Sequence, residues 1–127
     1  MLHLTDVHLD LYYSPMSNVK CPRPLCCRAL PYDPKENVTI FSGTFGDTRG
    51  DCDIQIHFVS DALKHIARSH PDLDYIFYTG DSVPHNVWDT SIESNLDHIL
   101  AVTHMLKSAF ANNKNLTIVP VLGNHEV

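Results

Sequence analysis

Long hydrophobic runs are missing from this 127-residue sequence, whose longest apolar stretches span only residues 75–78 and 118–122. A helix that crosses a bilayer needs about 20 consecutive apolar residues, so we expect no transmembrane helix here. Basic residues are also scarce, with nine Lys and Arg against 15 Asp and Glu and a formal net charge of −6. This balance argues against nucleic acid as a partner, because a phosphate backbone requires a basic surface. A phosphoester substrate stays open, since a bound metal would reverse the local charge.

The sequence also lacks a Cys-x-x-Cys pair, although it has four cysteines: Cys21, Cys26, Cys27 and Cys52. Adjacent Cys26 and Cys27 do not easily serve one tetrahedral zinc ion, so disulfides are favoured over zinc, with three pairings open. Two glycosylation sequons begin at Asn37 and Asn115. Together these features favour an oxidising compartment and a secreted chain.

A signal peptide is absent as well, because no basic start and apolar stretch precede the first predicted strand. For a secreted protein, this indicates that Met1 is not the natural start. At the other end, Val127 follows a motif that ordinarily opens a loop. We therefore expect a fragment of a longer protein.

Two secondary-structure elements and a long loop are predicted for the first half of the chain. Residues 2–5 are a strand candidate, and residues 9–53 are rich in Pro, Gly, Asn and Cys and predict a loop that the cysteines staple. Helical spacing begins at Ile56, with Asp53 as a plausible N-cap and Pro71 as the stop.

The second half predicts a strand, a helix and a strand. Residues 75–79 form a β-prone run typical of a strand buried on both faces. Residues 90–93 match a capping box and open a helix. Its predicted apolar stripe is Ile92, Leu96, Ile99, Leu100, Met105, Leu106 and Phe110. Residues 116–122 follow as a strand. The whole order predicts an α/β fold, with a βαβαβ parallel sheet covered by helices.

Polar residues follow each of the three predicted strands: Asp6 and His8, then Asp81, then Asn124 and His125. The carboxyl ends of parallel strands form one crevice, so these side chains should converge there. Mixed carboxylate and imidazole ligands suit zinc, iron or manganese. Asp81 follows the central strand and is placed to bridge two metals, while His125 is placed to protonate a leaving group. Asp6, Asp81 or Asn124 alone would be more typical of a turn or a helix cap, but the set predicts a metal site.

The remaining histidines carry weaker signals. His85 lies four residues beyond Asp81 and is placed to contact a phosphate, although an exposed loop histidine is the alternative. Most helical histidines fall on polar faces and are expected to be solvated: His57, His65, His70, His98 and His104. Glu126 either orients a neighbouring site residue or lies on the surface.

As a set, Asp6-x-His8, Gly80-Asp81 and 123–126 (Gly-Asn-His-Glu) resemble the first three motifs of calcineurin-like metallophosphoesterases. A finer resemblance is to the acid sphingomyelinase family. It is carried by residues 4–10, 21–28, 50–53, 79–88 and 123–126 and runs over nearly the whole chain.

This resemblance implies a secreted or lysosomal glycoprotein with two zinc ions that cleaves sphingomyelin, at a membrane surface, to ceramide and phosphocholine. Asp6 and His8 would bind the first zinc, Asp81 would bridge, and Asn124 would bind the second. His85 and His125 would act on the phosphate and the leaving group. The implied disulfides are Cys21–Cys26 and Cys27–Cys52.

The resemblance also implies that residues 1–127 are the N-terminal portion of a catalytic domain, without its later histidine ligands or a saposin-like domain. This portion alone is expected to be inactive. Two alternatives stay open: a related phosphodiesterase acting on nucleotides or polyphosphate, and a truncated, non-catalytic product. The oligomeric state stays open too.

Overall fold

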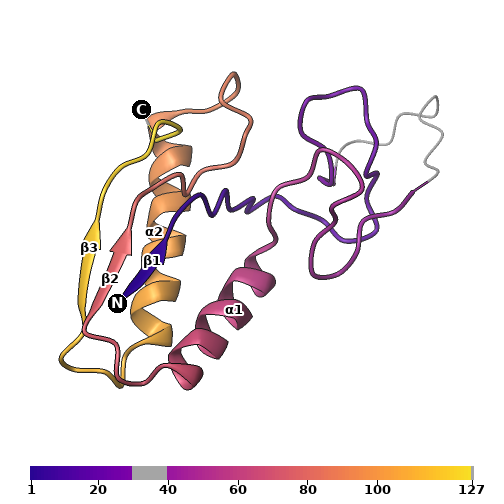
Figure 1. The fold of residues 1–127 in the computed structure, drawn as a ribbon. Helices are drawn as coiled ribbons and strands as arrows, with labels where there is room; N and C mark the ends of the chain where they lie inside the picture. Colours follow the sequence, from indigo (N-terminus) through magenta and orange to yellow (C-terminus); the bar gives the residue numbers. More distant parts are fainter. Residues whose placement is uncertain (30–39, 127) are drawn as a thin grey trace.

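The computed structural model describes residues 1–29 and 40–126. Its elements, in chain order, are β1 (Leu2–Leu4), α1 (Ile56–Ser69), β2 (Tyr75–Tyr78), α2 (Ile92–Ala109) and β3 (Thr117–Pro120). The three strands are parallel and adjacent in the order β1-β2-β3. Figure 1 shows the described parts of the long segment between β1 and α1 extending to one side of this sheet and its helices. The predicted βαβαβ α/β fold is confirmed.

Both helices pack on the same face of the sheet. Ile76 and Tyr78 of β2 are buried together with Leu63 of α1 and Val102 of α2 in one hydrophobic core. The alternate residue Phe77 points the other way and is exposed. The prediction of a strand buried on both faces is therefore wrong for the described residues, because one layer of helices covers only one face of a sheet.

The start of α1 differs from the prediction. Gln55, and not Asp53, is the N-cap, and its side-chain oxygen accepts hydrogen bonds from the backbone N–H groups of His57 and Phe58 at 2.6 and 3.1 Å. Asp53 instead accepts hydrogen bonds from His85. At the other end, α1 stops two residues before Pro71, as predicted.

The buried face of α2 is also rotated relative to the prediction. The capping box joins Ser91 to Ser94, one residue later than predicted. His98, Val102 and Leu106 are buried. Three members of the predicted stripe are exposed instead: Ile92, Leu96 and Leu100. His98 is only 3% exposed, so its predicted solvation is wrong; its Nδ1 lies 2.6 Å from the carbonyl oxygen of Ser94.

The predicted long loop is stapled by two disulfides, Cys21–Cys26 and Cys27–Cys52. This is the pairing that the family resemblance implies. Among the described residues between β1 and α1, only isolated bridges occur. Cys27 is fully buried beside Tyr13 and Val19 in a small second core. Of the two sequon residues, Asn115 is exposed and Asn37 lies outside the described residues.

The two disulfides should differ in their contribution to stability. Removing Cys27–Cys52, which joins residues 25 apart, should lower the free energy of unfolding by about 3.5 kcal/mol. Removing Cys21–Cys26, which joins residues five apart, should cost about 2 kcal/mol, because a shorter loop restrains the unfolded chain less. Denaturant unfolding of the two Cys→Ser double variants measures the difference. Equal losses would contradict this loop-length explanation.

Neither helix of the described residues combines the length and hydropathy that crossing a bilayer requires.

Candidate metal centre

The loops that follow the three strands meet at the carboxyl edge of the sheet. The backbone N–H groups of Asp6 and His8 donate to the carbonyl oxygens of Gly80 and Asp81 at 3.1 and 2.8 Å. These bonds continue the pairing of β1 and β2 beyond the strands themselves. The polar residues after both strands are therefore held in register.

Three of the predicted ligands adopt an unusual backbone conformation. Asp6, His8 and Asp81 have φ values of 53°, 42° and 53°, in the left-handed region that favours glycine. Such a conformation costs on the order of 1–3 kcal/mol and persists where the surroundings enforce it. Here one ligand atom from each residue lies within 4.8 Å of the others. The structure thus brings these three predicted ligands together.

Two glycines permit the close approach of the β2 and β3 loops. A Cβ on Gly80 would lie 2.0 Å from the backbone nitrogen of Gly123, and a Cβ on Gly123 would lie 2.2 Å from Oδ1 of Asp81. A side chain at Gly80 would displace the backbone at Gly123, and a side chain at Gly123 would displace Asp81. The same Oδ1 accepts a hydrogen bond from the backbone N–H of His125 at 2.8 Å. Asn124, another predicted ligand, is exposed in this loop.

His8 is oriented by the backbone. Its Nδ1 lies 2.9 Å from the carbonyl oxygen of Val83, which only accepts hydrogen bonds, so Nδ1 carries the proton. The Nε2 lone pair of neutral His8 is therefore free for a ligand, and Nε2 lies 3.9 Å from Oδ1 of Asp6. Metal-binding histidines are typically held in this way.

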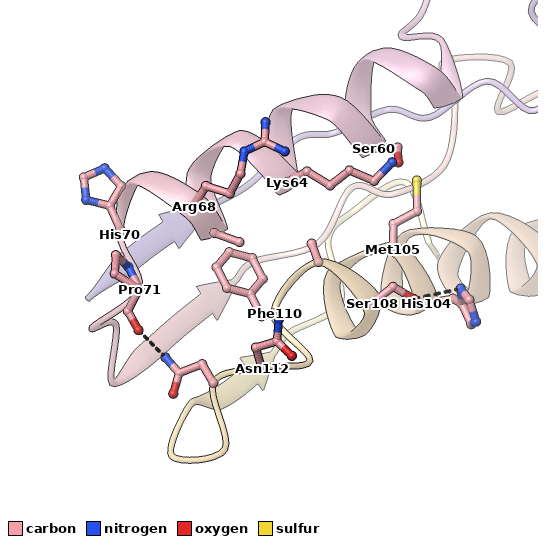
Figure 2. A pocket seen from close by; sticks show the side chains of 13 residues that line it. Ser60, Lys64, Arg68, His70, Pro71, His104, Met105, Ser108, Phe110 and Asn112 are labelled. Atoms are coloured by element: carbon pink, nitrogen blue, oxygen red, sulfur yellow. Dashed lines mark hydrogen bonds between the residues drawn. The ribbon is translucent and has the colours of Figure 1, made fainter.

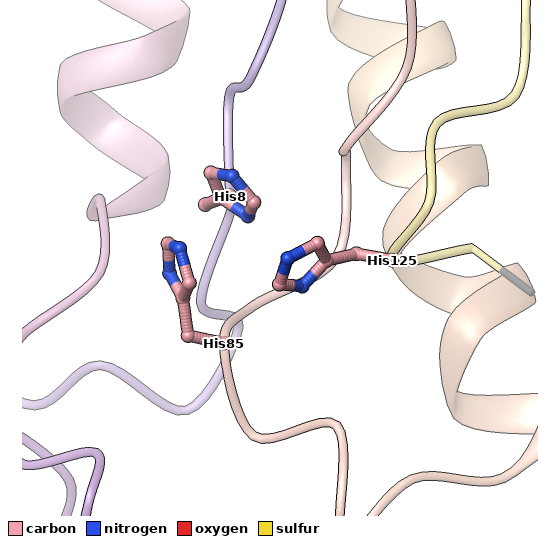
Figure 3. A group of neighbouring side chains, drawn as sticks. All are labelled: His8, His85 and His125. Atoms are coloured by element: carbon pink, nitrogen blue, oxygen red, sulfur yellow. The ribbon is translucent and has the colours of Figure 1, made fainter.

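The two histidines predicted to act in catalysis lie beside His8 (Figure 3). The His8 and His85 rings stack with centroids 3.9 Å apart, and the His125 ring lies edge-on at 4.8 Å from His8 and 5.0 Å from His85. One nitrogen from each lies within 4.8 Å of the others. His85 is therefore part of this cluster and not an isolated loop residue.

Asp53 is a site residue that sequence reasoning missed. Its carboxylate accepts from the backbone N–H and from Nδ1 of His85, both at 2.6 Å. The Asp53 side chain is only 8% exposed. A signal was available, because Asp53 directly follows Cys52 in one of the segments that carry the family resemblance. Its proximity to the helix start suggested a cap instead.

Glu126 is the second residue whose role the structure defines. Its carboxylate accepts hydrogen bonds from the backbone N–H groups of Asp81 at 2.9 Å, of Gly123 at 2.6 Å, and of Ser82. Burial raises the pKa of Glu126, but these three hydrogen bonds outweigh burial and hold the pKa below its ordinary value. The sequence left open whether Glu126 orients a neighbouring site residue or lies on the surface. These three contacts exclude a free surface position.

Tyr78 lies beneath the cluster with its hydroxyl 2.6 Å from Oγ of Ser82. Burial, with smaller contributions from the carboxylates of Glu126, Asp81 and Asp6, raises the pKa of Tyr78 to about 12. The phenol therefore stays protonated at neutral pH and is no candidate for a base.

The donor set fits a divalent transition metal. Asp6 and Asp81 supply carboxylates and His8 an imidazole, a mixture typical of zinc, iron or manganese sites. Asp81 keeps Oδ2 available while Oδ1 is hydrogen-bonded. In addition, Nδ1 of His125 is buried without a hydrogen-bond partner among the described residues.

A groove on the surface of the helices lies elsewhere. It has a volume of about 530 Å³ and runs between α1 and α2, with Lys64, Arg68, Met105 and Phe110 among its lining residues (Figure 2). None of the predicted site residues lines it. The candidate metal centre is therefore identified by the chemistry of its side chains, and this groove is separate from it.

Residues 1–127 match the family described as "Calcineurin-like phosphoesterase". The chain is 33% identical over 127 residues to sphingomyelin phosphodiesterase B of Dictyostelium discoideum, and 34% identical over 126 residues to sphingomyelin phosphodiesterase 1 of Caenorhabditis elegans. Each alignment covers 99% of this chain but only 19% and 21% of those relatives. The chain thus spans about a fifth of their length.

Relatives with other names are also similar. Identity is 27% over 135 residues to the endopolyphosphatase of Neurospora crassa, and 30% over 125 residues to the human cyclic GMP-AMP phosphodiesterase SMPDL3A. These alignments cover 99% and 98% of this chain, and 17% and 25% of the relatives. The similar proteins therefore differ in their named substrates.

Proposed function

The chain belongs to the calcineurin-like phosphoesterase family, and on that premise we propose that it carries part of the active site of a zinc-dependent sphingomyelin phosphodiesterase. The reaction is hydrolysis of sphingomyelin to ceramide and phosphocholine at a membrane surface. The convergence of Asp6, His8 and Asp81 beside two further histidines is the observation that carries the proposal. The two disulfides support a secreted or lysosomal location, because both compartments are reached through an oxidising pathway.

Four residues would hold the metal ions in this proposal. Asp6 and His8 would bind the first zinc, Asp81 would bridge, and Asn124 would bind the second. When bound, such a pair supplies Lewis-acid polarisation of the phosphate oxygens. The protein prepares these side chains in advance, since the Nδ1 proton of His8 and Oδ1 of Asp81 are already hydrogen-bonded to the backbone.

The two catalytic histidines would have different tasks. His85 donates Nδ1–H to Asp53, which fixes the orientation of its ring, and Nε2 is the ring nitrogen left to face the phosphate group. His125 would deliver a proton to the leaving oxygen of ceramide. His125 is held in place through its backbone N–H, which donates to Asp81.

Asp53→Asn tests the orienting carboxylate. It should lower kcat/KM by about 10–100-fold, the usual cost of losing a residue that orients a site histidine, and leave metal content unchanged. Asp51→Asn is the matched control, because Asp51 lies two residues away and is exposed. Steady-state kinetics and metal analysis of both variants check this. Unchanged kinetics in Asp53→Asn would contradict the assigned role.

The proposed substrate is tested on the full-length protein. Purified protein is assayed with sphingomyelin in mixed micelles, a cyclic dinucleotide and long-chain polyphosphate, before and after chelation and re-addition of zinc or magnesium. We expect sphingomyelin to be preferred and zinc to restore activity best. Preference for the dinucleotide or polyphosphate would support the alternative substrate class, nucleotides or polyphosphate, which is suggested by the similarity to the human phosphodiesterase and the fungal endopolyphosphatase.

Residues 1–127 expressed alone should bind zinc weakly and show negligible hydrolysis. Four protein ligands shared by two ions leave both undersaturated. Calorimetric zinc titration and a sphingomyelin assay of this portion test the expectation. Robust zinc-dependent turnover would contradict the domain assignment, whereas inactivity together with a message that stops after Val127 would favour a non-catalytic product.

A further inference from the structure

Glu126 joins the loop after β2 to the loop after β3. Its Oε2 accepts hydrogen bonds from the backbone N–H groups of Asp81 at 2.9 Å and Gly123 at 2.6 Å. Its Oε1 accepts from the N–H of Ser82. Two of these three donors lie 44 and 45 residues away in sequence. One carboxylate therefore connects both loops that carry proposed ligands.

The connection lies where the backbone is least relaxed. Asp81 has a positive φ of 53° and Gly80 a positive φ of 86°, and Gly80 and Gly123 approach too closely for any Cβ. A left-handed conformation at Asp81 is unfavourable unless neighbouring groups hold it. Glu126 satisfies the N–H groups of Asp81 and Ser82 directly at this point, so it stabilises the conformation that aims the Asp81 carboxylate.

Charge strengthens the connection. The three hydrogen bonds run from neutral backbone donors to an ionised acceptor, which makes them stronger than bonds between neutral groups. Glu126 is half-buried, and among the described residues no basic side chain donates a hydrogen bond to its carboxylate. Its negative charge therefore interacts mainly with the backbone N–H groups of the two loops.

We propose that Glu126 is a positioning residue that sets the spacing between Asp81 and Asn124, and thereby the affinity of the centre for its second metal ion. The inference rests on the proposed metal ligands but not on the identity of the substrate. It assigns to Glu126 no contact with metal or substrate, and its effect passes through the backbone of the two loops.

The two oxygens of Glu126 allow a graded test in the full-length protein. Glu126→Gln keeps one oxygen that bridges the loops and loses only the bond to Ser82, whereas Glu126→Ala loses all three bonds. Competition with a chromogenic chelator measures zinc affinity without any substrate. Affinity for the more weakly held ion should fall about 10–100-fold in Glu126→Ala, and by less in Glu126→Gln.

Two control variants separate positioning from general destabilisation. Glu93→Gln changes an exposed carboxylate in the first turn of α2 and should alter nothing. Val102→Ala opens a cavity in the core and should lower the melting temperature of the metal-free protein while leaving zinc affinity intact.

The inference is overturned if Glu126→Ala keeps wild-type zinc affinity, or if Val102→Ala loses affinity to the same extent at a similar melting temperature. Either result leaves the proposed function standing. The opposite result is also informative. If zinc affinity falls from wild type to Glu126→Gln to Glu126→Ala, but the wild-type protein does not hydrolyse sphingomyelin, the proposed substrate is refuted and the role of Glu126 still stands.

Discussion

Replacing Asp81 with Ala in the full-length protein should lower kcat by on the order of 10³-fold or more. Asp81 follows the central strand, and its carboxylate lies within 4.8 Å of the ligand atoms of Asp6 and His8. In the proposed centre it is the residue that would contact both ions. Without its charge, the two cations would repel each other and one would be lost.

The loss should fall on kcat more than on KM, because a two-metal clamp acts on charge that develops in the transition state. Metal analysis should show about one equivalent lost per protein. Asp74→Ala is the matched control, since Asp74 is exposed and lies before the same strand, at its opposite end. A full complement of two zinc ions and most of the activity in Asp81→Ala would refute the bridging role.

Asp81→Ala also removes the acceptor for the His125 backbone N–H, so a second variant separates ligand from scaffold. Asp81→Asn retains an oxygen for that hydrogen bond but has no negative charge. We expect it to share the loss of metal while keeping the melting temperature of the metal-free protein close to that of the wild type. A large fall in that temperature would mean that Asp81 acts mainly on the loop.

The order of elements and the position of the site could be read from the sequence. Each strand has an apolar run bounded by polar residues, and each polar group follows a strand at the same point, as Asp6, Asp81 and Asn124 do. Parallel topology then requires these groups to share one edge. Local pattern and topology therefore suffice to predict that polar side chains at strand ends share one edge, as Asp6, His8 and Asp81 do.

Burial on α2 shows where local pattern fails. Leu96 and Leu100 are apolar but exposed, whereas His98 is buried between them. Periodicity identifies a helix, but which face is covered depends on where α1 and the sheet lie, and the described residues cover only one side. Because α2 has apolar residues on its exposed face as well as on its buried face, the apolar pattern alone did not indicate which face packs on the core.

The residues that support the site were not predictable from spacing. Asp53 contacts His85, 32 residues away, and lies between β1 and α1, where the described positions form neither helix nor strand. Glu126 acts on backbone N–H groups, which every residue but proline has, so no sequence pattern marks its partners. Candidate metal ligands can be recognised from their side-chain chemistry. The residues that orient them, such as Asp53 and Glu126, can be recognised only from the tertiary structure.

Replacing His125 with Ala should slow sphingomyelin hydrolysis by roughly 10²–10⁴-fold, the usual range for a lost general acid, while metal content stays near normal. His125 is not among the proposed ligands, and its ring lies 4.8 Å and 5.0 Å from the His8 and His85 rings. Metal analysis beside that of Asp81→Ala distinguishes the two roles. His65→Ala is the control, because His65 is an exposed histidine of α1.

The leaving group gives the sharper test of this prediction. Ceramide departs as an alkoxide that needs a proton, whereas p-nitrophenolate is stable without one, so a general acid matters little for a p-nitrophenyl phosphodiester. His125→Ala should therefore lose far less activity on p-nitrophenyl phosphocholine than on sphingomyelin, and His85→Ala should lose similar activity on both because it acts on the phosphate. Equal losses on both substrates in His125→Ala would mean that His125 stabilises the phosphate and does not deliver the proton.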